Sequence, residues 1–160
     1  MWIDWLRLAP LLVFIYFGAR LSLIDWKSHR LPNRLVAISI VGILMFQLAF
    51  CLAVGDFTNL SQAGLAAVKV FSSYVVLFLL SGGQLGLGDV KFAIPNGLIL
   101  GWYFPEAWLI SIIATFLLAG LVSLLALSVN KIDRKSHIPL GPFMYFGSII
   151  ALFLVNLLAQ

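Results

Sequence analysis

The chain has 160 residues, of which 62% are hydrophobic and 10% are charged, and its mean hydropathy is +1.09. Soluble domains carry about 25% charged residues, and a soluble protein of this size has too little interior to bury so much apolar surface. The composition therefore excludes the soluble classes of protein and predicts an integral membrane protein. The net charge of +4 comes largely from basic residues in short gaps between apolar runs, so it indicates membrane topology and not a nucleic-acid partner.

A membrane-spanning helix needs about 20 apolar residues, within a range of ~17–25. Five runs are long enough: Leu8–Ile24, Leu35–Val54, Ala63–Leu80, Ala107–Val129 and Ile138–Leu158. The first run leads into Asp25 and a basic stretch and has no small-residue cleavage signature, so we expect a retained helix and not a signal peptide. No repeat or linker interrupts the chain, and residues 1–160 are therefore predicted to form one membrane domain.

A sixth apolar run, Val90–Trp102, is shorter and contains Lys91, Pro95 and Asn96. It can be a short span or a re-entrant segment, because polar and helix-breaking residues are tolerated at membrane depth where protein or water satisfies the backbone. The charges of the gaps between the runs distinguish these alternatives.

Two gaps are basic and two contain no Lys or Arg. Asp25–Arg34 and Asn130–His137 are the basic gaps, with the bases Lys27, Arg30, Arg34, Lys131, Arg134 and Lys135. Gly55–Gln62 and Tyr103–Glu106 have none. Basic short loops stay in the cytoplasm. Six spans place both basic gaps and Gly82–Asp89 on that side, whereas five would translocate one basic gap. We therefore predict an all-α membrane protein with six transmembrane helices and a polar cavity opening to the cytoplasmic side. Aromatic residues gather at the predicted outer boundaries: Trp2, Trp5, Trp102, Tyr103 and Trp108.

Two of the six acidic residues adjoin apolar runs. Asp25 and Asp89 lie at the predicted cytoplasmic ends of spans, and two intervening helices return the chain to the same side. A carboxylate at membrane depth costs about 2.5–3.5 kcal/mol, so these acids indicate a functional site. An interfacial charge cluster is the alternative for Asp25. Asp89 follows Gly86-Leu87-Gly88, and the two glycines are expected to permit unusual backbone conformations and a close approach by an extended substrate. The other acids are expected at the surface: Asp4, Asp56, Glu106 and Asp133.

A pair of aspartates can hydrolyse a peptide bond without a metal or a covalent nucleophile. One carboxylate deprotonates water and the other, protonated, donates a proton to the developing oxyanion, so the pair shares one proton. Metal and cofactor chemistry are not expected, because Cys51 is the single cysteine and His29 and His137 have no clustered third ligand. Cys51 is interpreted as packing, and both histidines as surface or headgroup contacts.

Two polar residues inside apolar runs need a separate interpretation. Lys69 lies within Ala63–Leu80 and either extends outward to the interface or faces a polar cavity. Gln47 is predicted to form an interhelical hydrogen bond.

Three stretches of the sequence resemble the motifs of type IV prepilin peptidases, which are GxGD-type intramembrane aspartyl proteases. They are DWKSHRLPN at 25–33, GLGDVK at 86–91 and IPLGPF at 138–143, in the order of the family. The central G-x-G-D is also shared with presenilin-type intramembrane proteases. Together the three motifs extend over nearly all of the chain.

This resemblance implies an enzyme of a bacterial or archaeal inner membrane. It would cut the leader from type IV pilin-like precursors at the cytoplasmic face, after a glycine and just before the apolar helix of the precursor. Asp25 and Asp89 would be the catalytic pair, and the residues expected to shape the site are Gly86, Gly88, Pro139, Gly141 and Pro142. The implied partners are the prepilin precursor and the lipid bilayer, without nucleic acid, metal or cofactor.

The chain departs from the larger bifunctional members, which carry paired Cys-x-x-Cys motifs and N-methylate the new pilin N-terminus. It resembles the short peptidase-only members that serve Flp/Tad pili, so methyltransferase activity is not expected. Lys27, Arg30 and Lys91 are expected to contact anionic headgroups, each worth about 1 kcal/mol near the surface. The alternatives are a catalytically silent pilus-assembly protein of the same fold and a small transporter that uses the aspartates as a proton relay.

Overall fold

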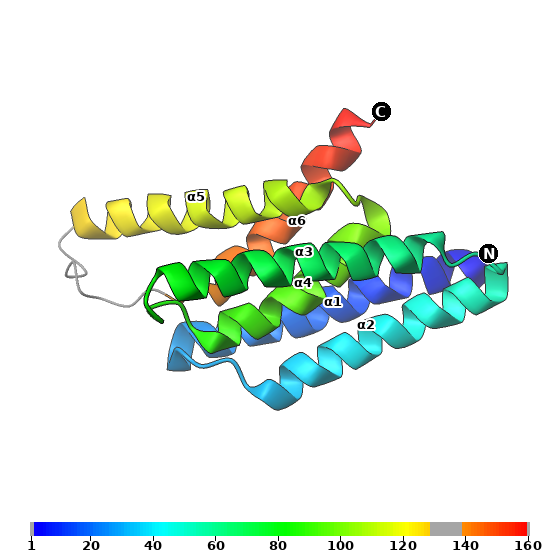
Figure 1. Ribbon diagram of the computed structural model, residues 1–160, viewed down its shortest axis with the longest axis horizontal. Helices are drawn as coiled ribbons and strands as arrows, with labels where there is room; N and C mark the ends of the chain where they lie inside the picture. The colour runs from blue at the N-terminus through cyan, green and yellow to red at the C-terminus, as the bar shows by residue number, and fades with distance from the viewer. Residues whose placement is uncertain (1, 129–138, 160) are drawn as a thin grey trace.

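The computed structural model of the chain describes residues 2–128 and 139–159, which form helices joined by short connections (Figure 1). The helices are α1 (Trp2–Ser28), α2 (Asn33–Val54), α3 (Thr58–Leu80), α4 (Leu87–Tyr103), α5 (Ala107–Ser128) and α6 (Gly141–Leu158). They alternate in direction, so the end of α1 lies at the same end of the bundle as the connection between α3 and α4 (Figure 1). The predicted basic gap Asn130–His137, with Asp133 and His137, lies outside the described residues.

Five of these helices are long and apolar enough to cross a membrane: α1, α2, α3, α5 and α6. Many of their large apolar side chains are exposed on the outer surface of the bundle, as expected for helices that contact lipid tails. The prediction of an all-α integral membrane protein is confirmed. The sixth helix, α4, has 17 residues and is about 26 Å long, which is short for a bilayer core of about 30 Å.

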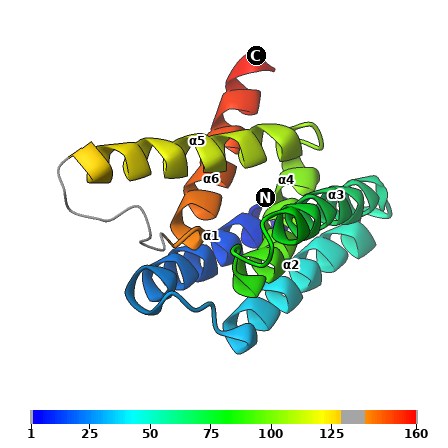
Figure 2. The ribbon, with the colours of Figure 1, turned by 60° about the vertical axis from the view of Figure 1, so that its left-hand side comes forward.

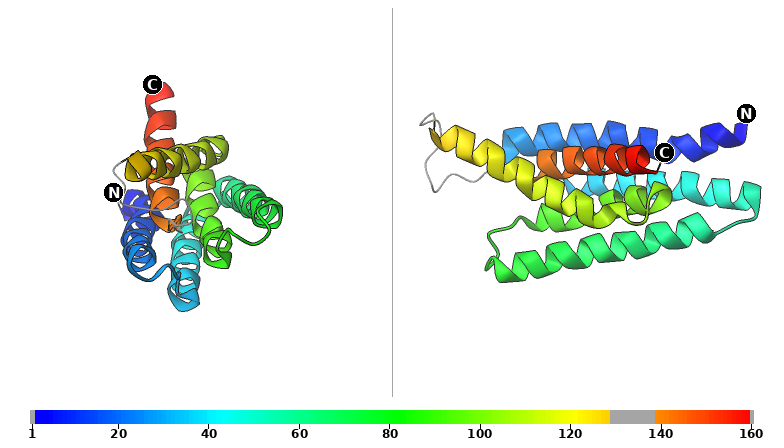
Figure 3. Two further views of the ribbon diagram at one scale, coloured as in Figure 1. Left: turned by 90° about the vertical axis from the view of Figure 1, so that its left-hand side faces the viewer. Right: turned by 90° about the horizontal axis from the view of Figure 1, so that it is seen from above.

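The short helix α4 is the centre of the bundle. It contacts all five other helices, and 12 of its 17 residues are buried. Its closest neighbour is α3, where Gly97 and Gly101 lie directly against Ala66 and Ala67. Small residues on both helices let the two backbones approach closely, which is the usual way for helices to associate in lipid. By contrast α5 packs mainly on α6 and lies at the edge of the bundle (Figures 2 and 3).

Hydrogen bonds between buried side chains join the helices at membrane depth. Ser148 of α6 donates to Asn96 Oδ1 of α4 at 2.6 Å, and the Ser111 hydroxyl of α5 lies 2.9 Å from that of Ser148. Gln47 of α2 donates to the Leu98 carbonyl of α4 at 3.0 Å, which confirms the predicted interhelical bond. These bonds fix α4 against α6 and α2, and join α5 to α6, in a medium that offers no water.

The helices extend beyond the apolar runs from which they were predicted. α1 continues through Asp25 and ends at Ser28, where His29 takes a left-handed φ of 50° and donates its N–H to the Asp25 carbonyl. α4 begins at Leu87, so Asp89 lies in its first turn and not in the expected gap Gly82–Asp89. Hydropathy marks where apolar side chains stop, whereas the helix stops where the backbone turns.

At the other end of α3 the helix boundary also differs from the end of the apolar run. α3 starts at Thr58, five residues before the apolar run, because Asp56 Oδ1 accepts hydrogen bonds from the Thr58 N–H at 2.8 Å and from its hydroxyl at 2.6 Å. The Thr58 hydroxyl and N–H also hold the pKa of the Asp56 carboxyl below its usual value. Trp102 is one of the aromatic residues predicted at the outer boundaries, and it lies near the end of α4. It is 2% exposed and packs edge-on against Phe50, because α4 is enclosed by other helices.

Candidate active site

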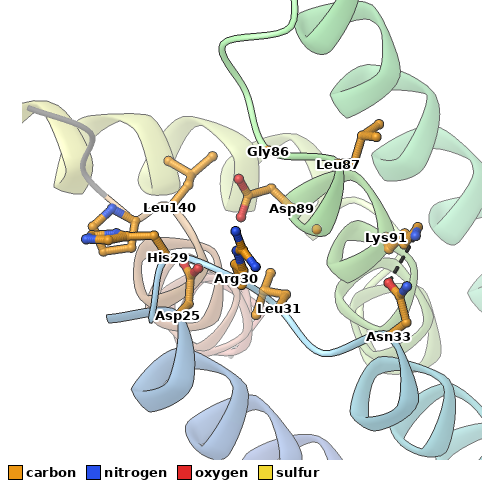
Figure 4. A pocket seen from close by; sticks show the side chains of 12 residues that line it. Asp25, His29, Arg30, Leu31, Asn33, Gly86, Leu87, Asp89, Lys91 and Leu140 are labelled. Carbon is orange, nitrogen blue, oxygen red and sulfur yellow. Dashed lines mark hydrogen bonds between the residues drawn. The ribbon is translucent and has the colours of Figure 1, made fainter. Parts of the chain in front are cut away.

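A cavity of about 340 Å³ lies at the end of the bundle that carries the α1–α2 and α3–α4 connections (Figure 4). Its walls come from the last turn of α1, the loop to α2, the first turns of α4 and the chain just before α6. The lining residues are Asp25, His29, Arg30, Leu31, Asn33, Gly86, Leu87, Gly88, Asp89, Lys91, Pro139 and Leu140.

Asp25 is held in this cavity by the start of α6. Its side chain is 5% exposed, and Oδ2 accepts the N–H of Gly141 at 2.9 Å. The first N–H groups of a helix have no partner within the helix and are suited to an anionic acceptor. Pro142 follows at a position where the missing N–H costs nothing, so the segment Pro139–Pro142 begins a helix and leaves the Gly141 N–H for the carboxylate.

Asp89 enters the same cavity from the first turn of α4 and is 7% exposed. Gly86 makes room for it, because a Cβ at Gly86 would lie 2.9 Å from Asp89 Oδ2. Gly88 makes room for the α1–α2 loop, because a Cβ there would lie 3.0 Å from the Cβ of Leu31. Both glycines are therefore needed for space.

The expectation of unusual backbone conformations at these two glycines was wrong. Gly86 is extended, with φ −69° and ψ 135°, and Gly88 lies within α4. In this segment the left-handed glycines are Gly82 and Gly83, with φ of 63° and 83°, in the turn that reverses the chain after α3.

The two carboxyl groups point into one space, from α1 and from α4 (Figure 4). They are close enough for the charge of Asp25 to act on Asp89. Among the described residues no three His, Cys, Asp or Glu side chains come together as a metal site. The arrangement supplies what acid–base catalysis by two carboxyls requires, which is one group to take a proton and one to give it.

Basic side chains line the cavity beside the two acids. His29 and Arg30 come from the α1–α2 loop, and Lys91 of α4 donates to Asn33 Oδ1 of α2 at 3.0 Å. Lys91, which was expected to contact lipid headgroups, is exposed and lines the cavity. Asn33 and Leu31 were not predicted as site residues, although both lie in the DWKSHRLPN stretch that carries Asp25.

The structure brings most of the predicted site residues to this cavity. Gly86, Gly88 and Pro139 line it directly, and Gly141 contacts it through Asp25. Pro142 is buried and lines a separate apolar groove between α1 and α6. It contributes to the cavity indirectly, because it lies in the first turn of α6, the helix whose Gly141 N–H binds Asp25.

Comparison with known proteins adds an independent finding. The sequence profile of the type IV leader peptidase family matches residues 12–127. A prepilin leader peptidase/N-methyltransferase of Pectobacterium carotovorum subsp. carotovorum is 28% identical over 161 aligned residues, which cover 96% of this chain and 54% of that protein. A protein of the same name from Legionella pneumophila is 29% identical over 154 residues, covering 92% and 50%. The chain thus spans about half the length of these relatives. No solved structure matches it significantly.

Proposed function

Because the chain belongs to the type IV leader peptidase family, we propose that it is a membrane-embedded aspartic endopeptidase that removes the leader peptide from type IV pilin-like precursors. The observation that carries this proposal is the pair of buried carboxyls, Asp25 and Asp89, in one cavity at one end of the bundle.

In the proposed reaction the two aspartates share a single proton. The ionised carboxylate takes a proton from a water molecule, whose oxygen attacks the scissile carbonyl carbon, and the protonated carboxyl donates its proton to the carbonyl oxygen. The tetrahedral intermediate then collapses and the C–N bond breaks. The leaving amine takes one proton from the pair and a hydroxyl proton of the intermediate returns to it, so the two carboxyls again share a single proton. The Gly141 N–H holds Asp25 in position while its protonation changes.

The cavity end of the bundle is proposed to face the cytoplasm of a bacterial or archaeal inner membrane. Lys27, Arg30 and Arg34 lie at this end, whereas Gly55–Phe57 at the other end contains no base. Basic short loops are retained on the cytoplasmic side. The sequence contains a single cysteine and no Cys-x-x-Cys pair, so the proposal covers peptide cleavage and not methyl transfer.

The direct test is cleavage of a type IV pilin precursor by the purified chain in lipid vesicles, with the products identified by mass spectrometry. The expected cut follows a glycine immediately before the apolar helix of the precursor. Intact precursor after incubation with a range of pilins would contradict the proposal. It would favour a silent assembly protein or a transporter of the same fold.

Gly141→Ala is expected to slow this cleavage. The added Cβ would lie 2.7 Å from Asp25 Oδ2 and 3.2 Å from its Cγ, so the carboxylate or α6 must shift. A shift of about 1 Å in a catalytic group can cost up to ~10²-fold in rate, and we expect a loss of about 10- to 100-fold in kcat.

The matched control is Gly64→Ala on α3, where an added Cβ meets no atom within 4 Å. Its cleavage rate should equal that of the unmodified chain. Equal rates for the two alanine variants would show that the contact between Gly141 and Asp25 has no part in the reaction.

A further inference from the structure

Asp89 lines a second cavity in addition to the one it shares with Asp25. This second cavity has a volume of about 250 Å³ and lies between the end of α3, the α3–α4 connection and α5. Three residues belong to both cavities, namely Gly86, Asp89 and Leu140. The proposed catalytic centre can therefore be reached from two sides, and one of them is the side of α3 and α5.

A lipid-facing groove continues from the second cavity along α3 and α5. It has a volume of about 430 Å³, and Leu77 belongs both to it and to the second cavity. Val76 of α3 and Leu109 and Ile112 of α5 form its apolar walls. We call it the α3/α5 groove. It adjoins, at Leu77, the second cavity that Asp89 lines.

Lys69 lies beyond the outer part of this groove, at the middle of α3. Eleven residues separate it from each end of the helix, Thr58 and Leu80, and its side chain is exposed. Its ammonium lies 5.6 Å from the ring centroid of Trp108, which lines the groove. Within the described part of the chain no carboxylate pairs with it. A cation at this depth of a membrane protein marks a functional position and calls for a polar partner.

We propose that the apolar helix of the precursor docks in the α3/α5 groove, with its scissile segment at Asp89 and a polar acceptor side chain facing Lys69. The proposal rests on the function proposed above and assigns a place for the substrate within it. A precursor cut just before its membrane helix must keep that helix in lipid while the preceding residues enter the cavity. An opening that faces lipid and includes a catalytic carboxylate meets both requirements.

A second groove, between α1 and α6, is the competing entrance. It is apolar, has a volume of about 450 Å³ and is lined by Ser22, Leu23 and Phe146 among others. Neither Asp25 nor Asp89 lines it. The α3/α5 groove is favoured because it joins the second cavity at Leu77 and so reaches Asp89, and because Lys69 can pair with a helix bound there.

The spacing of Leu77 and Lys69 on α3 also predicts how far along the groove the docked helix lies. Leu77 and Lys69 are eight residues apart on α3, which is about 12 Å along the helix axis. If the docked helix runs beside α3, the residue of that helix that faces Lys69 lies about eight residues from the residue that contacts Leu77. We expect the polar acceptor of the precursor at this position.

Disulfide cross-linking in vesicles tests this placement. The single native cysteine is buried and is first replaced, giving a Cys51→Ala parent whose cleavage activity and fold are checked. Val76→Cys is compared with Val68→Cys, a valine on the same helix about 80° around the axis that lines none of the described cavities. Their exposed fractions are similar, 52% and 64%. Leu23→Cys reports on the α1–α6 groove.

A pilin precursor with single cysteines along its apolar helix is expected to cross-link to Val76→Cys in one register and not to Val68→Cys or Leu23→Cys. Cross-linking at Leu23→Cys alone would overturn the docking proposal while leaving the peptidase proposal intact. Val76→Cys pairing with a second copy of the chain would also overturn it. If Val76→Cys cross-links to the precursor but the unmodified chain does not cleave it, docking is supported and the peptidase proposal is refuted. If neither cross-linking nor cleavage is observed, both proposals are refuted.

A second measurement does not depend on replacing Cys51. Val76→Trp should fill the groove and raise the KM for the membrane-bound precursor about tenfold, equivalent to ~1.4 kcal/mol of lost binding. Val68→Trp adds the same bulk about 80° around the axis of α3, outside the groove, and should leave KM unchanged. Equal KM values for the two tryptophan variants would contradict docking in the α3/α5 groove.

Discussion

Asp25→Asn and Asp89→Asn are each expected to abolish leader cleavage, with a fall in kcat of about 10²–10⁴-fold or more. Asparagine has the size of aspartate, and its side-chain oxygen can still accept the Gly141 N–H that holds Asp25. It cannot exchange a proton with water or with the peptide. The expected loss therefore comes from chemistry and not from folding, which near-native thermal stability of both variants would demonstrate.

The double variant should be scarcely slower than either single variant, because two residues that act as one unit do not contribute additively. Asp56→Asn is the matched control. Asp56 lies at the other end of the bundle, and the side-chain oxygen of asparagine can still accept the hydrogen bonds from Thr58, so the cleavage rate of this variant should be unchanged. Full activity in either Asp25→Asn or Asp89→Asn would refute the aspartyl mechanism.

Gly97→Ala is expected to lower the stability of the folded protein by about 1–3 kcal/mol, the usual cost of overpacking a well-packed core. A Cβ at Gly97 would overlap the Ala67 Cα and lie 2.8 Å from the Ala66 carbonyl oxygen. These are backbone atoms of α3, so α3 and α4 must separate to admit one methyl group. Thermal unfolding in detergent, or the rate of proteolysis during heating, measures the effect.

Gly120→Ala is the control for helix propensity. Gly120 also lies within a helix, α5, but an added Cβ there meets no atom within 4 Å. Alanine favours a helix more than glycine does, so Gly120→Ala should be neutral or slightly stabilising. An equal change in stability at Gly97 and Gly120 would show that the close approach of α3 and α4 does not stabilise the fold.

Apolar run length predicted the helices well, because a segment that must satisfy its own backbone in lipid has few alternatives to a helix. It did not predict which helix lies at the centre. The burial of Trp102 on α4 was not predicted. A signal was present in the sequence, because Val90–Trp102 is the shortest run and carries Asn96, Gly97 and Gly101, residues suited to contacts on all sides.

The meeting of Asp25 and Asp89 in one cavity was predicted from the number of spans between them. The contact of Asp25 with Gly141 was not, because it joins residues 116 positions apart and depends on how α6 packs beside α1. Spacing along the chain carries no information about such a contact. The cationic side chains were likewise assigned to headgroups, since their sequence positions do not reveal that Lys91 bonds to Asn33 beside the cavity.

The length of α6 has a consequence for the surrounding lipid. α6 has 18 residues and is about 27 Å long, slightly short for a bilayer core of about 30 Å. Each ångström of mismatch costs a fraction of a kcal/mol. Because α6 begins at the residue that holds Asp25, acyl-chain length should influence the alignment of the two carboxyls, and proteoliposomes made from shorter-chain lipids should show it as a change in cleavage rate.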